Sequence, residues 1–326
     1  MCSIEPGMSG FCRVRGNVDG KIQPLTYGAP CSINIDPIEK KPLFHFLPGS
    51  QILSLATAGC NLRCKFCQNW EISQGRPEDI RTYSATPDQL IEIAKSKGCR
   101  SIAYTYTEPA VFYEYALDCS IKAREAEIKN ILVTAAYINP EPCRELCRYT
   151  DAANVDLKAL SNDFYRDICD AELKPVLDAL VIAKNAGVML EVTNLVIPGL
   201  NDSDDDLTRL SRWIKENLGT ETPLHFSRFF PQYQMMDRDP TPKTTLRKAK
   251  EIAESEGLKH VYIGNVITKA GENTYCPGCG ELLIERERYT VLRNNMDDGA
   301  CPTCSREING VWDMLLPDKT FRQLKL

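Results

Sequence analysis

Short apolar runs alternate with longer segments of helical periodicity from about residue 51 onward. The clearest helix is predicted to begin after the N-cap Thr86, with Pro87 at its first position and Gln89 completing a capping box, and to stop at Gly98. The apolar runs predicted as strands are Gln51–Thr57, Arg100–Tyr106, Asn130–Thr134, Ala152–Leu157, Val188–Val196, Pro223–Phe229 and Lys259–Ile263. This alternation predicts an α/β fold with a parallel sheet, as a full or partial (β/α) barrel. Chemistry in such a barrel lies at the carboxyl ends of the strands.

Both flanks depart from this rhythm. Residues 1–50 are rich in Gly and Pro and show no sustained period, so we expect an N-terminal extension that wraps the core. Residues 51–268 are predicted to form the barrel. Beyond residue 268 the alternation stops and paired cysteines follow, which predicts a metal-ribbon tail over 269–326.

Composition excludes several classes of protein. The net charge of -5 over 326 residues gives no overall basic field, so neither nucleic acid nor anionic lipid is an expected partner. We find no apolar run long enough to span a membrane and no export signal, and we therefore expect a cytoplasmic protein.

Cysteine is unusually abundant, with 15 residues against 3 histidines. Thiols stay reduced in the cytoplasm, so grouped cysteines are better interpreted as metal ligands than as disulfides. A ligand set this rich in sulfur favours iron–sulfur clusters and structural zinc.

Cys60, Cys64 and Cys67 follow the first predicted strand with the spacing C-x3-C-x2-C. A cubane 4Fe–4S cluster normally takes four cysteines, so three thiolates leave one iron open to S-adenosylmethionine (SAM). The alternatives are a zinc site or buried free cysteines. Zinc normally has four ligands from paired C-x2-C modules, and a ferredoxin run would place a fourth cysteine soon after the third.

The loop resembles the hallmark of the radical SAM superfamily, C-x3-C-x-aromatic-C, with Phe66 as the aromatic residue beside the cofactor. Further segments are similar to the AmmeMemoRadiSam-system radical SAM proteins, which are related to pyruvate formate-lyase activating enzymes. These segments are Gly16–Gly20, Asp36–Pro42, Gly59–Leu62, Cys67–Trp70, Tyr104–Pro109, Asn194–Gly199 and the terminal cysteine pairs. The resemblance implies reductive cleavage of SAM and a low-potential electron donor such as a ferredoxin or flavodoxin.

The resemblance also implies SAM contacts at two strand ends. Glu108 stands where the superfamily has a Gly-Gly-Glu-like segment that contacts the SAM amino group, although Tyr106-Thr107 replaces the glycines. A carboxylate that favours a helix start is the alternative. Thr134 ends the next strand, in Val-Thr-Ala-Ala where the activating enzymes have Asp-Thr-Asn-Gly.

Asp156 and Lys158 are predicted to point into the barrel mouth, because alternate residues of a strand share a face. A carboxylate and an ammonium buried together need each other or a charged ligand. In the activating enzymes the similar Asp-Leu-Lys stretch lies at the SAM and substrate site, so Lys158 is a candidate catalytic residue. A structural ion pair is the alternative.

Three more strand residues are candidates. Thr193 and Asn194 could reach the methionyl or ribose part of SAM, or could merely cap a strand end. His225 shares a strand face with Ser227, and could position substrate or move a proton if that face lines the mouth. A hydrogen-bonded core histidine is the alternative.

Two C-x2-C pairs near the C-terminus can together hold one metal. They are Cys276 with Cys279 and Cys301 with Cys304. Structural zinc is expected, with a single iron as the alternative. The roles of Cys2, Cys12 and Cys31 stay open, and the other cysteines are interpreted as small core or surface residues.

We therefore predict a radical SAM oxidoreductase or activase-like enzyme that abstracts hydrogen from a substrate. The kinship with activating enzymes suggests a protein substrate. Modification of a small molecule or an RNA is the first alternative, and a non-catalytic metal-binding adapter is the second.

Overall fold

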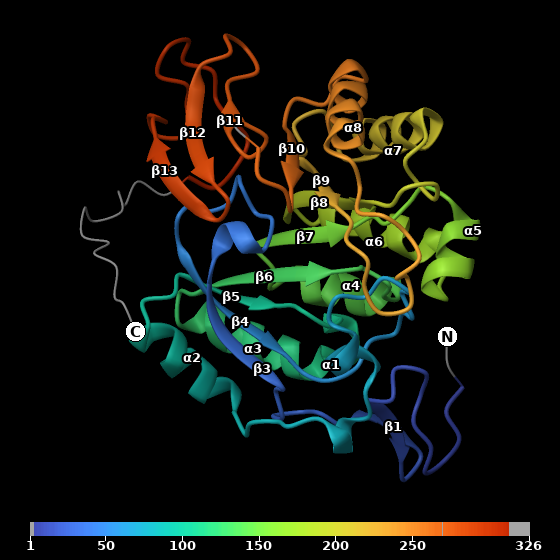
Figure 1. The fold of residues 1–326 in the computed structure, drawn as a ribbon. Helices are drawn as coiled ribbons and strands as arrows, with labels where there is room; N and C mark the ends of the chain where they lie inside the picture. The colour runs from blue at the N-terminus through green and yellow to red at the C-terminus, as the bar shows by residue number, and fades with distance from the viewer. Residues whose placement is uncertain (1–2, 269, 313–326) are drawn as a thin grey trace.

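A single eight-stranded sheet organises the molecule (Figure 1). The computed structural model describes residues 3–268 and 270–312. Strand order across the sheet is β10-β9-β8-β7-β6-β5-β4-β3, and every pair is parallel except β3 with β4. The strands are β3 (Ser32–Pro37), β4 (Gln51–Ala56), β5 (Ser101–Tyr104), β6 (Lys129–Thr134), β7 (Ala152–Asp156), β8 (Met189–Val196), β9 (Leu224–Arg228) and β10 (Val261–Gly264).

All seven predicted strands are confirmed, as β4 to β10. Strand order follows chain order, and β3 and β10 are the two edges of the sheet, so the fold is a partial barrel. The capping box at Thr86 is also confirmed: its hydroxyl accepts from the Gln89 N–H at 3.3 Å, and the Gln89 side chain accepts from the Thr86 N–H at 2.9 Å. The helices are α1 (Trp70–Gln74), α2 (Pro87–Ser96), α3 (Tyr113–Glu125), α4 (Pro140–Cys147), α5 (Asn162–Phe164), α6 (Leu173–Asn185), α7 (Asp204–Asn217) and α8 (Lys243–Ser255).

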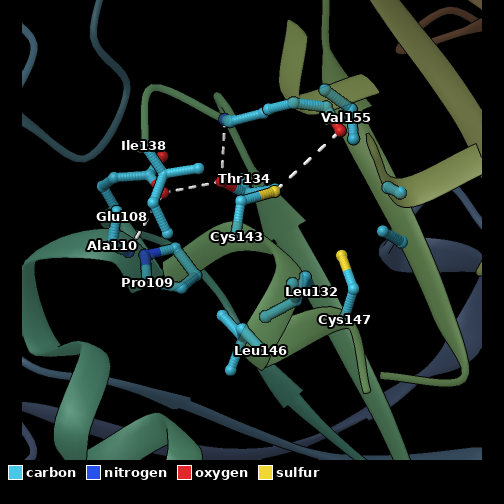
Figure 2. A pocket seen from close by; sticks show the side chains of 14 residues that line it. Glu108, Pro109, Ala110, Leu132, Thr134, Ile138, Cys143, Leu146, Cys147 and Val155 are labelled. Carbon is cyan, nitrogen blue, oxygen red and sulfur yellow. Dashed lines mark hydrogen bonds between the residues drawn. The ribbon is translucent and has the colours of Figure 1, made fainter. Parts of the chain in front are cut away.

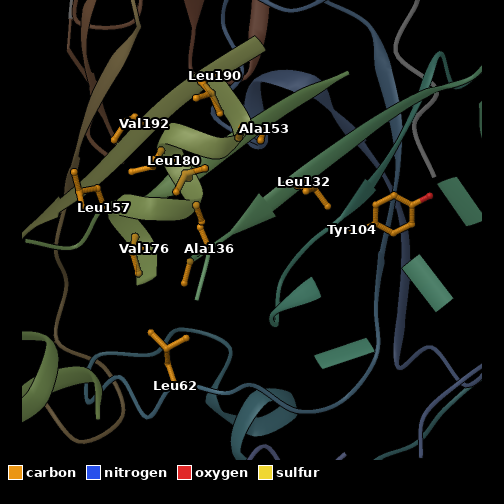
Figure 3. Close-up of a cluster of buried hydrophobic side chains, with 14 of the residues drawn as sticks. Leu62, Tyr104, Leu132, Ala136, Ala153, Leu157, Val176, Leu180, Leu190 and Val192 are labelled. Carbon is orange, nitrogen blue, oxygen red and sulfur yellow. The ribbon is translucent and has the colours of Figure 1, made fainter. Parts of the chain in front are cut away.

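The two faces of the sheet carry different side chains. Residues such as Val155 and Leu157 point toward the helices and belong to the main core together with Val176 and Leu180 of α6. Figure 3 shows Leu157, Val176 and Leu180 in this core. The opposite face is called the inner face here. At the amino ends of the strands, the inner face packs against residues 38–47. These residues are part of residues 38–50, which we call the floor segment.

Three short strands lie within the predicted N-terminal extension, and sequence patterns did not reveal them. β1 (Arg15–Val18) and β2 (Lys21–Pro24) form an antiparallel hairpin, while β3 joins the main sheet beside β4. Most residues of these strands are partly or fully exposed, so they lack the apolar run that marks the central strands.

The C-terminal ribbon (residues 274–308) contains a three-stranded antiparallel sheet of β11 (Thr274–Tyr275), β12 (Leu282–Glu287) and β13 (Thr290–Asn294). It packs on the floor segment through Arg286, which donates to the Phe44 carbonyl at 2.7 Å and lies 3.6 Å from Glu39. Figure 1 shows the ribbon at the end of the sheet away from α1. Cys2 and residues 313–326 lie outside the described residues. In the part that is described, we find no helix with the length and apolar character of a membrane span.

Candidate functional site

The cluster loop (residues 59–67) follows β4 at the carboxyl edge of the sheet. Gly59 has φ of 95°, and a Cβ atom there would lie 2.5 Å from Val14 and 2.8 Å from the Cys12 carbonyl oxygen. The next turn is held to the same N-terminal segment by Arg63, which donates to the Phe11 carbonyl. The N-terminal segment therefore packs directly on the loop that carries the three cysteines.

The surroundings of the three thiols suit sulfur ligands of a cluster. The Leu62 N–H donates to Cys60 Sγ at 3.4 Å, and Ser73 Oγ lies 3.2 Å from Cys67 Sγ. Burial raises the pKa of the Cys60 thiol well above its usual value, so a cluster that binds this sulfur must displace the thiol proton. Backbone and hydroxyl donors at metal-bound sulfur are typical of iron–sulfur sites, and these residues fit such a group.

Cys169 is a neighbour that sequence reasoning missed. It ends the π-helical turn Tyr165–Cys169 and is fully buried, and the proximity of its thiol lowers the pKa of Cys64. Its carbonyl oxygen accepts from the Arg63 N–H at 2.8 Å. Sequence gave no signal for this contact, because Cys169 lies in a segment with no motif of its own.

Lys158 and Asp156 lie beside this loop. Lys158 Nζ is 3.0 Å from Asp156 Oδ2 and 5.7 Å from the centre of the Phe66 ring. Burial alone would lower the pKa of Lys158, but Asp156 and the thiols of Cys64 and Cys169 raise it well above the usual value. The structure thus brings Lys158, Asp156 and Phe66 together at the cluster loop.

Glu108 and Thr134 meet at the ends of β5 and β6 (Figure 2). Thr134 donates its hydroxyl proton to Glu108 Oε1 at 2.6 Å, and the Ala135 N–H donates to Oε2 at 2.8 Å. Glu108 also caps the Ala110 N–H at 3.2 Å. Burial raises the pKa of Glu108, although these donors and Lys158 oppose the shift. The adjoining cavity toward α4 is apolar and about 40 Å³, too small for a nucleoside cofactor.

Thr193 and Asn194 point in different directions. Thr193 donates to Asn154 Oδ1 at 2.9 Å, and Asn154 donates to the Pro42 carbonyl of the floor segment at 2.8 Å. Asn194 is buried and donates to the Leu157 and Lys158 carbonyls at 2.8 and 3.1 Å. Asn194 therefore holds the end of β7, whereas Thr193 lies on the inner face. SAM contact by either residue stays a prediction.

His225 also lies on the inner face, but its contacts are not with the cluster loop. It is 3% exposed, and its Nε2 lies 2.6 Å from Glu191 Oε2, while Glu191 Oε1 accepts from the Phe44 and His45 N–H groups. Its ring stacks on Tyr262 at 5.0 Å. These partners place His225 at the floor segment, in the arrangement of a hydrogen-bonded core histidine, and its catalytic role stays a prediction.

The four ribbon cysteines converge. All four sulfur atoms lie within 4.8 Å of one another, with Cys276 Sγ 3.5 Å from Cys304 Sγ and Cys279 Sγ 3.6 Å from Cys301 Sγ. A tetrahedral zinc thiolate site has sulfur–sulfur separations of about 3.8 Å, since each Zn–S bond is about 2.3 Å. Burial opposes the shift, but N–H groups and neighbouring thiols lower the pKa of Cys276 to about 7, which favours the thiolate that a metal needs. The group fits a ribbon-like metal module.

Comparison with known proteins agrees with this geometry. The family model described as the radical SAM superfamily matches residues 54–211. An uncharacterised protein of Methanocaldococcus jannaschii is 48% identical over 94% of this chain and 92% of its own length. The pyruvate formate-lyase 1-activating enzyme of Escherichia coli K12 is 22% identical over 63% of this chain and 89% of its own.

A solved structure shares the fold. The crystal structure of a radical SAM methyltransferase from Sphaerobacter thermophilus has a TM-score of 0.53 at 16% identity, covering 68% of each chain. The three-cysteine loop after the first parallel strand, the partial barrel and these matches lead to one assignment. The chain belongs to the radical SAM superfamily.

Proposed function

We propose that this protein cleaves SAM reductively at a 4Fe–4S cluster held by Cys60, Cys64 and Cys67, and that it abstracts hydrogen from a substrate. The observation that carries the proposal is the set of three thiols on one loop, next to Lys158 and Phe66 at the carboxyl ends of parallel strands. When bound, the cluster supplies the electron that splits SAM into methionine and a 5′-deoxyadenosyl radical.

The protein's own residues would orient and shield this chemistry. Glu108 presents a buried carboxylate whose position is fixed by Thr134 and Ala135, which suits a contact to an ammonium group such as that of SAM. Asp156 is 44% exposed while Lys158 is 10% exposed, so the carboxylate can accept a hydrogen bond from a ligand without losing its partner. The packing of Val14 on Gly59 excludes water from one side of the loop.

A protein is the proposed substrate, with a ferredoxin or flavodoxin as the electron donor. Support comes from relatives named as pyruvate formate-lyase activating enzymes, in Escherichia coli and Clostridium pasteurianum. For the ribbon we propose structural zinc, because the sulfur separations match a tetrahedral ion.

The test is formation of 5′-deoxyadenosine by anaerobically reconstituted protein with SAM and dithionite. Cys60→Ala is expected to lose the product, because a cluster with two thiolates is not retained. Cys169→Ala is the matched control, since it removes a buried thiol in contact with Cys64 but outside the three-cysteine motif. Reconstituted wild type that forms no 5′-deoxyadenosine, or a Cys60→Ala variant as active as wild type, contradicts the proposal.

A further inference from the structure

A second buried lysine–aspartate pair lies on the inner face, and the proposed chemistry does not use it. Lys41 Nζ lies 2.7 Å from Asp36 Oδ2, and the two side chains are 2% and 7% exposed. Lys40, which is 42% exposed, contacts the other oxygen of the same carboxylate at 2.8 Å. These residues belong to the segment Asp36–Pro42, for which the sequence suggested no role.

The pair faces the interior of the partial barrel. Asp36 pairs directly with Ile52 across β3 and β4, and opposite residues of an antiparallel pair point to the same side. Ile52 packs with Ala103 and Ile131 on the inner face. Asp36 is therefore on the inner face as well.

Tyr106 connects this pair to the cluster loop. Its hydroxyl donates to Asp36 Oδ2, and Lys41 Nζ lies 4.3 Å from the centre of its ring. Its carbonyl oxygen accepts from Asn69 at 2.7 Å, two residues after Cys67. Its backbone has φ of 62°, which is uncommon for a bulky residue. One residue thus joins the two places: the Tyr106 backbone contacts Asn69 after the cluster loop, and its side chain contacts the lysine–aspartate pair.

The floor segment next to Lys41 is also connected to Thr193, one of the residues predicted to contact SAM. The Pro42 carbonyl accepts from Asn154, whose side-chain oxygen accepts from Thr193. Lys41 therefore lies on the same inner face of the sheet as Asn154 and Thr193.

The charge of Lys41 is incompletely balanced. An ammonium has three N–H donors, and the described residues give Lys41 one hydrogen-bond acceptor and one aromatic face. Two ammonium groups share the single Asp36 carboxylate, which leaves one net positive charge. Burial lowers the pKa of Lys41 to about 8 even though Asp36 opposes the shift. At Lys158, by contrast, the surrounding groups outweigh burial and raise the pKa.

We propose that Lys41, positioned by Asp36 and Tyr106, binds an oxyanion group of the substrate, a carboxylate or a phosphate, inside the barrel. This inference rests on the proposed function, because it assigns the anion to the molecule that the radical attacks. An oxyanion would accept a hydrogen bond from the remaining N–H of Lys41 and would balance the extra positive charge. Asp36 and the Tyr106 hydroxyl act by fixing the ammonium.

The experiment measures anion binding by the cluster-loaded, zinc-loaded holoenzyme through its thermal unfolding midpoint. The probes are inorganic phosphate and acetate, each compared with chloride at equal ionic strength. At a free concentration of ten times its Kd, a probe that binds is expected to raise the thermal unfolding midpoint by about 2–4 °C. The probe that gives the saturable rise identifies the group as phosphate or carboxylate.

Lys41→Met is expected to remove the saturable rise, and it leaves Asp36 paired with Lys40 and Tyr106 so that the fold keeps its contacts. Lys40→Met is the matched control. It removes the exposed partner of the same carboxylate, and we expect it to weaken probe binding by less than about threefold because solvent screens that charge. Iron content of each variant verifies that the cluster loop is intact.

Two results overturn the proposal. One is a wild-type midpoint that does not respond to either probe, or responds equally in Lys41→Met. The other is a Lys41→Met variant whose Kd for SAM is about tenfold or more higher, since the ammonium would then serve the SAM carboxylate. Both measurements proceed without turnover, so loss of 5′-deoxyadenosine formation would count against the proposed function alone.

Discussion

Replacement of Gly59 by alanine tests how closely the N-terminal segment packs on the cluster loop. The new Cβ would lie 2.5 and 2.6 Å from the two methyl carbons of Val14 and 2.8 Å from the Cys12 carbonyl oxygen. Val14 is fully buried, so it has little freedom to move. A left-handed backbone costs a non-glycine residue about 1–2 kcal/mol, and overpacking adds about 1–3 kcal/mol. The expected total is about 2–5 kcal/mol.

Gly98→Ala separates the two contributions. Gly98 also has a positive φ, of 65°, but a Cβ there meets nothing within 4 Å. It should therefore cost about 1–2 kcal/mol from the backbone alone. The assay is anaerobic urea unfolding with iron content per chain. We expect Gly59→Ala to lose both stability and iron, because the next residue is Cys60, and Gly98→Ala to keep its iron.

A double variant then tests the contact itself. Adding Val14→Ala to Gly59→Ala removes the nearest clashing atoms, so the pair should be less destabilised than the sum of the single changes by about 1 kcal/mol or more. Equal losses in Gly59→Ala and Gly98→Ala, with equal iron content and additive effects of Val14→Ala, would refute this reasoning.

Three further predictions concern the floor segment and the ribbon. Arg286→Met should lower the free energy of unfolding by about 3–5 kcal/mol, because it strands the buried Glu39 carboxylate; chemical unfolding checks this, and a loss below 1 kcal/mol refutes it. Burial holds the pKa of His45 well below its usual value, so the folded state keeps it neutral and stability falls as pH drops below about 6.5. His45→Asn should reduce that fall by about 1.4 kcal/mol per pH unit, and unchanged pH dependence contradicts it. Cys301→Ala should lose one equivalent of ribbon metal but retain the cluster iron in elemental analysis, and loss of both together contradicts independent sites.

The central sheet could be predicted because its strands are buried on both faces and read as apolar runs. Val155 and Leu157 pack on the helices as their alternation requires, and Asn154 and Asp156 take the other face. β3 escaped prediction for the opposite reason. It is an edge strand with exposed Asn34 and Ile35, and its pairing with β4 is decided by tertiary contact.

The candidate site divides in the same way. Local spacing was enough to predict the four ribbon cysteines, which converge in the structure, because their motifs are short. The same kind of spacing singled out the three cysteines of the cluster loop, whose metal binding stays a prediction. Local spacing could not predict contacts between segments that lie far apart in the sequence. His225 meets Glu191 under the floor segment, and Cys169 meets Cys64 through a π-helical turn, neither of which has a short-range signal.

The bond between Arg286 and the Phe44 carbonyl joins segments 242 residues apart, whereas the sheet pairs each strand with the one made just before it. A nascent chain can therefore assemble β3 to β10 in the order of synthesis, with every new strand finding its neighbour already in place. The support beneath Phe44 arrives last, from the ribbon. Until the ribbon has been synthesised, the floor segment lacks this contact. Competence for catalysis would therefore be acquired late in synthesis of the chain.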